Sequence, residues 1–435
     1  MGNFSVTQHG RRGNLCEKFP PAGALRTLEP TTPRKLTGLA PLARIAFNGG
    51  DLTPVATHYL ERWKSDAADA DAVMDLSTVL QLMGEQEQGL ELQSIALDLR
   101  RHYRVVGATE PPALRLLSIH TPGDLTRNNT LEFLVESTDV ELQLLYVTED
   151  TPLPDPLPDH DLAIVSVCQS RRNHSLLQHL EGLMKDWPRP VLCRPRLIDR
   201  LSRDGVAGLL RDIPGTVVPA TITLARQTLE QLGRSEMVIS ELLPDGDFPI
   251  IIRPVDSDKG FGLAKITNAD EIVDYLKGRP EASFYTARFV EYRNDDGQYR
   301  KYRIVFIGGE PYVCHMAISP SWIVHYMSAG MFENPEKRAE EARFFESFEE
   351  DFALRHRHAL RLIAERLALE YVGIDCGEAP DGRLLLFEAD SGMTVHSMDP
   401  PELFPYKRPQ MRKVFQAFRE MLLHMGERRP FENAA

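Results

Sequence analysis

Two short apolar segments joined by a tight turn constrain this chain more than any other feature. Residues 371–375 read YVGID and residues 384–388 read LLLFE, with Asp381-Gly382 between them. An Asp-Gly pair between two apolar runs is a strong signal for a β-hairpin. The segment therefore predicts two antiparallel strands, each of which ends in an acid.

Three carboxylates of this hairpin, Asp375, Glu388 and Asp390, are predicted to converge. Side chains alternate along a strand, so Glu388 and Asp390 share a face, and antiparallel pairing brings Asp375 beside them. Such acids repel one another unless a cation neutralises them, and oxygen ligands without His or Cys favour Mg²⁺ or Mn²⁺ over zinc. The other interpretation is that they are three solvated acids at strand ends.

A second segment, residues 248–263 (FPIIIRPVDSDKGFGL), carries a cation and two glycines. An apolar strand delivers Arg253 at its end, and Gly260 and Gly262 follow in a loop. Glycines let backbone N–H groups approach an anion, so this arrangement is typical of a phosphate-binding site. A solvent-exposed hairpin with a structural arginine is the alternative.

The two segments together resemble the ATP-grasp superfamily of carboxylate–amine ligases. The resemblance is closest to D-alanine:D-alanine ligases, with RimK-like ligases next. The last strand of the D-alanine:D-alanine ligases reads like EAN, before a Gly-Met-Thr and a His-Ser motif. Here residues 388–390 read EAD, and the matching motifs lie at 391–394 and 396–397. Asp390 stands where the family usually has Asn. The resemblance implies an α/β fold with an ATP-grasp domain, a preceding Rossmann-like α/β domain and a helical N-terminal domain.

The resemblance also implies ATP and about two Mg²⁺ or Mn²⁺ ions as cofactors, and it assigns roles by position. The implied metal ligands are Asp375, Glu388 and Asp390. The implied nucleotide-binding residues are Arg253, Lys259, Gly260, Gly262, Arg288, Phe289, Val290 and Glu291. The residues that it places at the transferred phosphoryl group, as catalytic residues, are Lys259, Arg303 and His315, with Lys301 beside them. The implied substrate-binding residues are Ser391, Gly392, His396, Ser397 and His325.

Some of these roles have simpler alternatives. Arg303 and His315 would otherwise be surface charges that alternate with core residues. His325 lies between Trp322 and Tyr326, where an isolated histidine is often a hydrogen-bonded core residue. The family's entry helix normally carries a lysine after an aspartate, which is missing here, and we expect Arg203 or Arg211 to replace it.

The rest of the chain divides by composition and periodicity. Residues 1–44 are predicted to be a disordered basic arm, and residues 45–108 a helical domain with one tetratricopeptide-like hairpin. Residues 109–195 alternate strands with helices, which predicts a parallel sheet. Residues 196–426 form the ATP-grasp domain, with residues 197–211 as one amphipathic helix, and residues 427–435 are a tail. A protein or peptide partner could dock on the helical domain.

Composition excludes several classes of protein. The formal charge of -13 and a pI near 5.5 argue against binding nucleic acid through general basicity. Five scattered cysteines without a CxxC motif predict reduced thiols. No apolar run approaches the roughly 18 residues of a membrane span, and no signal-peptide pattern begins the chain. We therefore expect a cytoplasmic protein without a membrane partner.

The expected activity is joining a carboxylic acid to an amine through an acyl phosphate, with release of ADP and phosphate. Gly373 stands where the D-alanine ligases carry an arginine, so the D-alanine dipeptide is not the expected product. The acid and amine could be small molecules or peptides. The alternatives are a catalytically altered ATP-binding scaffold or regulatory protein, and a kinase that releases a phosphorylated product.

Overall fold

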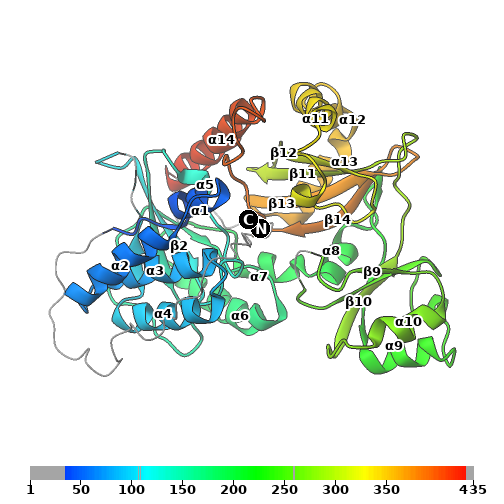
Figure 1. The fold of residues 1–435 in the computed structure, drawn as a ribbon, viewed down its shortest axis with the longest axis horizontal. Coiled ribbons are helices and arrows are strands. Elements are labelled where there is room, and N and C mark those ends of the chain that lie inside the picture. Colours follow the sequence, from blue (N-terminus) through cyan, green and yellow to red (C-terminus); the bar gives the residue numbers. More distant parts are fainter. Residues whose placement is uncertain (1–34, 106, 108, 258–259, 428–435) are drawn as a thin grey trace.

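The computed structural model describes residues 35–105, 107, 109–257 and 260–427. Three sheets organise these residues, and Figure 1 shows them in two halves. One half holds the N-terminal helices and the first sheet, and the other holds the second and third sheets. The α/β class predicted from the sequence is confirmed.

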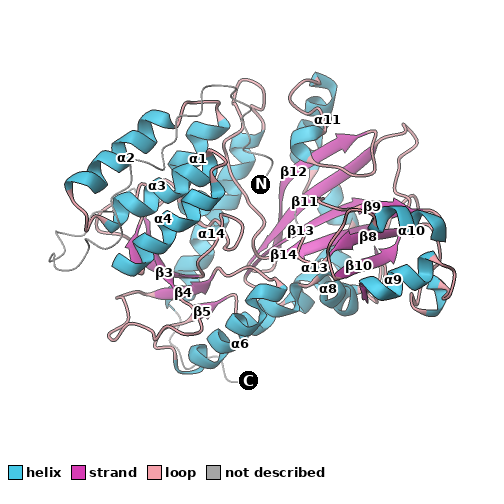
Figure 2. Ribbon diagram, turned by 60° about the horizontal axis from the view of Figure 1, so that its bottom comes forward, coloured by secondary structure: helices cyan, strands magenta, loops and turns pink. Residues whose placement is uncertain are grey.

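Four helices come first: α1 (Leu39–Phe47), α2 (Thr53–Ser65), α3 (Ala70–Leu82) and α4 (Gln86–Leu99). The Asp69 side chain caps α3 by accepting a hydrogen bond from the Ala72 N–H at 3.0 Å. Helix α3 is buried on nearly all sides because α2 and α4 both pack against it. Figure 2 shows these helices beside the first sheet. The tetratricopeptide-like character of α3 and α4 stays a prediction.

Helix α1 corrects the predicted extent of the basic arm. It begins at Leu39 and buries Leu42 and Ala43, so residues 39–44 are part of the packed helical segment. The alternation of apolar residues in this short helix is hidden among prolines and arginines in the sequence. Residues 35–38 of the predicted arm are also ordered against the rest of the protein, because Leu36 is buried and forms a β-bridge with Val105. Residues 1–34 and the predicted tail beyond residue 427 lie outside the described residues.

The first sheet has the order β1-β3-β2-β4-β5. Its strands are β1 (His102–Arg104), β2 (Leu114–His120), β3 (Val140–Tyr146), β4 (Leu162–Val165) and β5 (Val191–Leu192). The strands β3, β2, β4 and β5 are parallel, as the sequence predicts, and β1 adds an antiparallel edge. Strand β1 lies within the range predicted to be helical. The short helix α5 (Glu132–Val135) and helix α6 (His174–Leu183) connect the strands.

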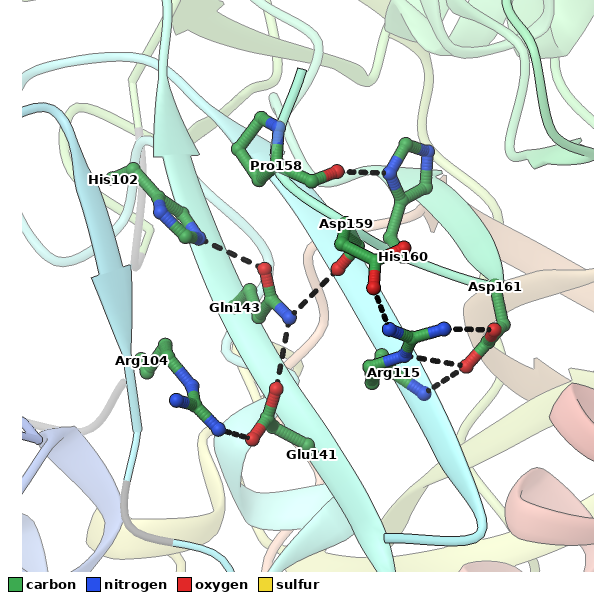
Figure 3. A network of polar contacts seen from close by, with 9 residues as sticks. All are labelled: His102, Arg104, Arg115, Glu141, Gln143, Pro158, Asp159, His160 and Asp161. Carbon is green, nitrogen blue, oxygen red and sulfur yellow. Dashed lines mark hydrogen bonds and ion pairs between the residues drawn. The ribbon is translucent and has the colours of Figure 1, made fainter. Parts of the chain in front are cut away.

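A network of polar side chains holds the amino ends of these strands together (Figure 3). Gln143 on β3 donates to Glu141 at 2.8 Å, and its amide oxygen lies 2.8 Å from the His102 ring on β1. Arg115 on β2 bonds Asp161, just before β4, at 2.7 Å. Ligands of parallel α/β sheets bind at the opposite, carboxyl ends of the strands. We therefore interpret this network as structural.

Glu132 in α5 gives a testable pH dependence. Its Oε2 atom accepts a hydrogen bond from the Ala40 N–H at 3.2 Å. Burial, reinforced by the nearby Asp75 and Glu136 carboxyls, raises the pKa of Glu132 to about 7 despite the backbone donors. A carboxyl whose pKa is higher in the folded state than in the unfolded state binds protons preferentially when folded. Its contribution to stability is therefore full below pH 4.5 and lost as pH rises through 7.

We expect Glu132→Gln to remove that loss. Urea denaturation should give similar unfolding free energies for both proteins at acidic pH. At alkaline pH the variant should be more stable than the wild type, by at most about 3 kcal/mol. Parallel pH profiles for the two proteins would show that the Glu132 carboxyl does not titrate in this way.

The second sheet is antiparallel, with the order β7-β10-β8-β9. Its strands are β7 (Thr221–Ala225), β8 (Ile250–Pro254), β9 (Ala264–Ile266) and β10 (Ser283–Arg288). It carries α9 (Arg226–Gly233) and α10 (Ala269–Leu276), and their apolar side chains form a separate small core with it. In Figure 1 this unit lies at the lower right.

The third sheet has the order β12-β11-β13-β14-β6. Its strands are β6 (Thr216–Val217), β11 (Tyr299–Ile307), β12 (Glu310–Ser319), β13 (Tyr371–Glu378) and β14 (Leu384–Asp390). The hairpin of β13 with β14 that the sequence predicts is confirmed, and β11 and β12 form a second hairpin. The turn residue Gly382 has φ of 81°, a conformation that favours glycine. Strand β6 pairs with β14 in parallel.

Helices cover the third sheet and link it to the first. They are α11 (Pro335–Ser347), α12 (Phe352–Arg355), α13 (Arg357–Leu367) and α14 (Lys407–Glu427). Helix α14 contacts strands of both sheets, so this helix connects the two halves. The single-turn helices are η3 (Arg171–Asn173), η4 (Met184–Asp186), η5 (Asp199–Leu201), η6 (Ile239–Glu241) and η7 (Tyr326–Ser328).

The predicted single helix over 197–211 is wrong. The chain instead forms α7 (Pro195–Ile198), the turn η5, and α8 (Arg203–Leu210). Ser202 starts a new helix by accepting a hydrogen bond from the Gly205 N–H at 3.2 Å. A Cβ at Gly205 would lie 2.4 Å from the Arg200 carbonyl oxygen, so the break needs glycine at this position.

No helix within the described ranges is both long enough and apolar enough to cross a membrane. The four cysteines within those ranges are all buried, and Cys16 lies outside them.

Candidate functional site

One cavity of about 1100 Å³ lies where the three sheets meet. Its walls come from the loops after β2 and β4, from β8 and β10, and from β11 to β14 with the loop that follows. Most residues that the sequence singled out line it. They are Arg253, Gly260, Arg288, Phe289, Val290, Arg303, His315, His325, Asp375, Glu388, Asp390, Gly392 and His396.

The acidic hairpin forms the floor of the cavity. Asp375 on β13 lies opposite Glu388 on β14, and Asp390 lies opposite Gly373. A Cβ on Gly373 would come within 2.6 Å of the Met393 sulfur, so a side chain at this position would displace the loop after β14. All three carboxylates face the same cavity, as predicted.

Asp375 is the most strongly held of the three. Its side chain is 1% exposed and forms a two-pronged ion pair with Arg303 on β11, at 2.7 and 2.9 Å. Lys301 lies 2.9 Å from the same carboxylate. Burial alone would raise the pKa of Asp375, but the two cations more than offset it and hold that pKa well below its usual range. Asp375 is therefore a carboxylate with two cationic partners.

Glu388 and Asp390 have protein partners of their own. Glu388 pairs with Arg203 at the start of α8, which confirms that Arg203 lies at the site. Arg211 is exposed and does not line the cavity. Burial would raise the pKa of Glu388, but Arg203 and other cations lower it overall. Asp390 accepts a hydrogen bond from the Gly392 N–H at 2.8 Å.

The three carboxylates do not form a closed metal cage. Among the residues that the structure describes, no three His, Cys, Asp or Glu side chains lie close enough together to hold an ion. The three carboxylates are thus less closely grouped than predicted, because Arg303 and Lys301 form ion pairs with Asp375. Mg²⁺ bound with a nucleotide usually takes only one or two protein carboxylates and fills its sphere with phosphate oxygens and water. Glu388 and Asp390 fit that smaller requirement.

Arg253 lies on the opposite wall, at the end of β8. Its side chain is 8% exposed, and its Nε donates to Ser257 Oγ at 3.1 Å, which fixes the turn after the strand. Gly260 and Gly262 have φ of 74° and 66°. A Cβ on Gly260 would lie 2.8 Å from the His325 ring. His325 is half-buried and lines the cavity beside the glycine loop. Lys259 lies outside the described residues.

The end of β10 and the segment that follows it meet the cavity through Arg288, Phe289 and Val290. Phe289 is packed edge-on against Trp322, with ring centroids 5.5 Å apart, and Lys265 lies 3.7 Å above its ring. Glu291 differs from its prediction. It is exposed and does not line the cavity, because its carboxylate turns back to accept the Tyr292 and Arg293 N–H groups at 3.1 Å.

His315 also differs from its prediction. It lies opposite Arg303 on the neighbouring strand and lines the cavity. Burial and the Arg303 charge hold its pKa well below the usual value, so the ring is neutral. Its Nε2 atom is buried and has no hydrogen-bond partner among the described residues. The cation predicted at this position is therefore supplied by Lys301 and Arg303 alone.

The loop after β14 brings Gly392 and His396 to the cavity but turns other predicted residues away. Ser391 is 3% exposed and lies beneath the surface, and Ser397 does not line the cavity. Gly262, in the loop after β8, does not line it either. Burial lowers the pKa of His396 to about 4. Its Nδ1 atom accepts a hydrogen bond from the Met398 N–H at 3.3 Å, so the proton of the neutral ring is on Nε2.

Sequence reasoning missed two parts of the wall. Phe47 of α1 lines the cavity and packs against the His396 ring at 5.5 Å, so the helical segment reaches the site. Arg127 lines it from the loop after β2. The only sequence signal for Arg127 was its position after a predicted parallel strand, where ligands usually bind.

Comparison with known proteins gives fold-level likeness only. No family model matches the chain, and no curated protein matches it. Among solved structures, the chain is similar to a RimK-domain ATP-grasp protein from Sphaerobacter thermophilus, with 17% identity and a TM-score of 0.40 over 71% of this chain and 99% of that one.

Two ligases are similar to the same degree. The VanG D-Ala:D-Ser ligase from Enterococcus faecalis has 14% identity and a TM-score of 0.44 over 71% of this chain and 99% of that one. The D-alanine–D-alanine ligase from Coxiella burnetii has 9% identity and a TM-score of 0.45 over 72% and 96%. Likeness at this level decides neither the reaction nor the substrates, so the functional argument below is based on the cavity itself.

Proposed function

We propose that this chain is an ATP-dependent carboxylate–amine ligase of the ATP-grasp type. The observation that carries the proposal is the charge arrangement of the cavity where the three sheets meet. Cations from three different elements, Arg203, Arg253 and the Arg303–Lys301 pair, face carboxylates on one hairpin. Transfer of a phosphoryl group to a carboxylate brings two anions together, so it needs such a concentration of positive charge.

The proposed reaction has two steps. A carboxylate oxygen of the acid attacks the γ-phosphorus of ATP, and the bond from that phosphorus to ADP breaks. The nitrogen of an amine then attacks the carbonyl carbon of the acyl phosphate, phosphate leaves, and the amine loses a proton. Lys301 and Arg303 would neutralise the charge of the transferred group, and the walls of the cavity would limit the access of water to the labile intermediate.

The same residues fit the two cofactors. Arg253 and the backbone after β10 would bind ATP between the second and third sheets. Glu388 and Asp390 would hold Mg²⁺ or Mn²⁺ together with the phosphate oxygens, with Asp375 nearby. Such an ion, when bound, neutralises phosphate charge. The described part of the chain supplies no evident protein nucleophile, and this reaction needs none.

Hydroxylamine trapping tests the proposal. The full chain is incubated with ATP, Mg²⁺, hydroxylamine and a panel of carboxylic acids, and ADP and hydroxamate are measured. We expect one or more acids to give ADP and hydroxamate in equal amounts. In a parallel incubation without hydroxylamine, a kinase would still release ADP and a phosphorylated product, whereas the ligase would not. The existing ion pairs of Asp375 and Glu388 would favour the alternative of a scaffold. A scaffold would bind ATP and give no ADP with any acid.

A further inference from the structure

The wall of the cavity includes a group of aromatic rings, which we call the aromatic recess. It is formed by Phe47 near the end of α1, Phe133 of α5 and His396 in the loop after β14. The centroid of the His396 ring lies 5.5 Å from that of Phe47 and 6.1 Å from that of Phe133. Phe47 and His396 are half-buried, so part of each ring is accessible, whereas Phe133 is 2% exposed and lies behind them. Neither phenylalanine has a role in the ATP site proposed above.

The aromatic recess presents little charge to a ligand. Burial lowers the pKa of His396 to about 4, so its ring is neutral at neutral pH. Lys407 and Asp399 also line the cavity close to this ring, and they form an ion pair with each other at 3.3 Å. Met398, the next apolar residue of the wall, is 4% exposed. Burial of an apolar group against such a surface is favourable.

The fold holds Phe47 in place at this wall. At the start of α1, the Gly38 N–H donates a hydrogen bond at 3.1 Å to Asp75 of α3, which is 1% exposed. Near the other end of α1, Arg44 pairs with Glu136, just after α5, at 2.6 Å. Figure 1 shows α1 and α5 together on the side of the first half that faces the third sheet. A wall that is already ordered loses less conformational entropy when a ligand binds.

The aromatic recess adjoins a cation of the proposed reaction. Arg303 donates to the Thr394 carbonyl at 3.4 Å, and His396 follows Thr394 by two residues. Two residues span at most about 7 Å. Arg303 and Lys301 carry two positive charges against the single negative charge of Asp375, so one positive charge remains for an anion. One small molecule can therefore place a carboxylate beside Arg303 and an apolar group in the recess.

We propose that the acid substrate is an arylalkanoic acid, which is a carboxylic acid with an aromatic ring on a short alkyl chain. Its ring packs against Phe47 and His396, and its carboxylate lies beside Arg303, next to the phosphoryl group that is transferred. This inference rests on the proposed function, because it names the acid of that reaction. Aromatic rings prefer edge-to-face contacts, which the rings of the recess already make with one another.

Ligand-observed NMR titrations without ATP test this inference. The full chain is titrated with phenylacetate, 3-phenylpropanoate and 4-phenylbutanoate. Each acid is compared with its cyclohexyl analogue, which has a similar size but no aromatic ring, and with its carboxamide, which has no charge. We expect at least one phenyl acid to bind saturably. Its cyclohexyl analogue should bind about 2- to 10-fold more weakly, and its carboxamide about 10- to 100-fold more weakly.

Variants of Phe47 locate the effect. Phe47→Leu keeps an apolar side chain without the ring, so it should weaken binding of the phenyl acid by about 2- to 10-fold and barely change binding of the cyclohexyl analogue. Phe47→Ala should weaken both. Phe415→Leu, which changes a half-buried phenylalanine of α14 outside the cavity, is the matched control and should bind as the wild type does. Melting temperatures report whether each variant folds, and the leucine variant keeps the test open if the alanine variant does not.

The inference is overturned if none of the three phenyl acids binds, if the cyclohexyl analogue or the carboxamide binds as tightly, or if both Phe47 variants bind like the wild type. Because the titrations contain no ATP, their outcome is independent of hydroxylamine trapping. Binding of a phenyl acid without hydroxamate formation from any acid would refute the ligase while leaving the recess as a binding site. Hydroxamate formation without binding of a phenyl acid would refute only the inference about the recess.

Discussion

Replacing Arg303 by methionine should destabilise the protein more than any other single substitution at the site. The Asp375 carboxylate is 1% exposed and shares two hydrogen bonds with Arg303. Without the guanidinium, a buried charge would keep only Lys301 as a partner. Removing one member of a buried ion pair typically costs about 3 to 5 kcal/mol. Urea denaturation of Arg303→Met at neutral pH should show a loss of this size.

A double-mutant cycle separates the ion pair from simple loss of packing. Asp375→Asn removes the charge that Arg303 neutralises, so Arg303→Met should cost much less in the Asp375→Asn background. Arg361→Met removes an arginine whose partner, Glu365, is exposed, and it should change stability little. Equal costs for Arg303→Met in both backgrounds would mean that the pair does not hold the two strands together.

Replacing Glu388 by glutamine should abolish most turnover of ATP. Glu388 lines the cavity, and it is one of the two carboxylates that fit a metal ion together with nucleotide phosphates. Glutamine keeps the size of the side chain but loses its charge. Loss of one charged group that stabilises a transition state typically lowers kcat by about 100- to 1000-fold. ADP release in the hydroxylamine assay measures this loss directly.

Glu378→Gln is the matched control for that experiment. Glu378 lies on the neighbouring strand β13 and bonds His356 at 2.8 Å, but it does not line the cavity. We expect this variant to release ADP as the wild type does at a temperature where both are folded. If Glu388→Gln also kept the wild-type rate of ADP release, the carboxylate hairpin would have no part in the reaction.

Local patterns predicted much of the site. The Asp381-Gly382 turn and the alternation of apolar residues gave the β13–β14 hairpin and the common face of its acids, since both depend on neighbours in sequence. Arg253 at the end of β8 was predicted for the same reason. Chain order alone predicted the parallel strands of the first sheet.

The predictions that the structure corrects share a different physical origin. Asp375 was expected to bind metal as Glu388 does. The register of β11 against β13 instead brings Arg303 and Lys301 into ion pairs with the Asp375 carboxylate. His315 was expected to be charged, and only its three-dimensional burial makes it neutral. Phe47 reaches the cavity because α1 packs against α3 and α5. Pairings between distant segments decided each case, and no local pattern encodes them.

Calorimetric titration of ATP into the full chain at millimolar Mg²⁺ tests the central claim most directly. The account predicts saturable binding of one nucleotide per chain. Arg253→Ala should weaken it by about 10- to 100-fold, and Arg234→Ala, an exposed arginine at the C-terminal end of α9 that does not line the cavity, should not weaken it. Absence of binding, or equal affinity in the wild type and Arg253→Ala, would contradict the claim that this cavity holds the triphosphate.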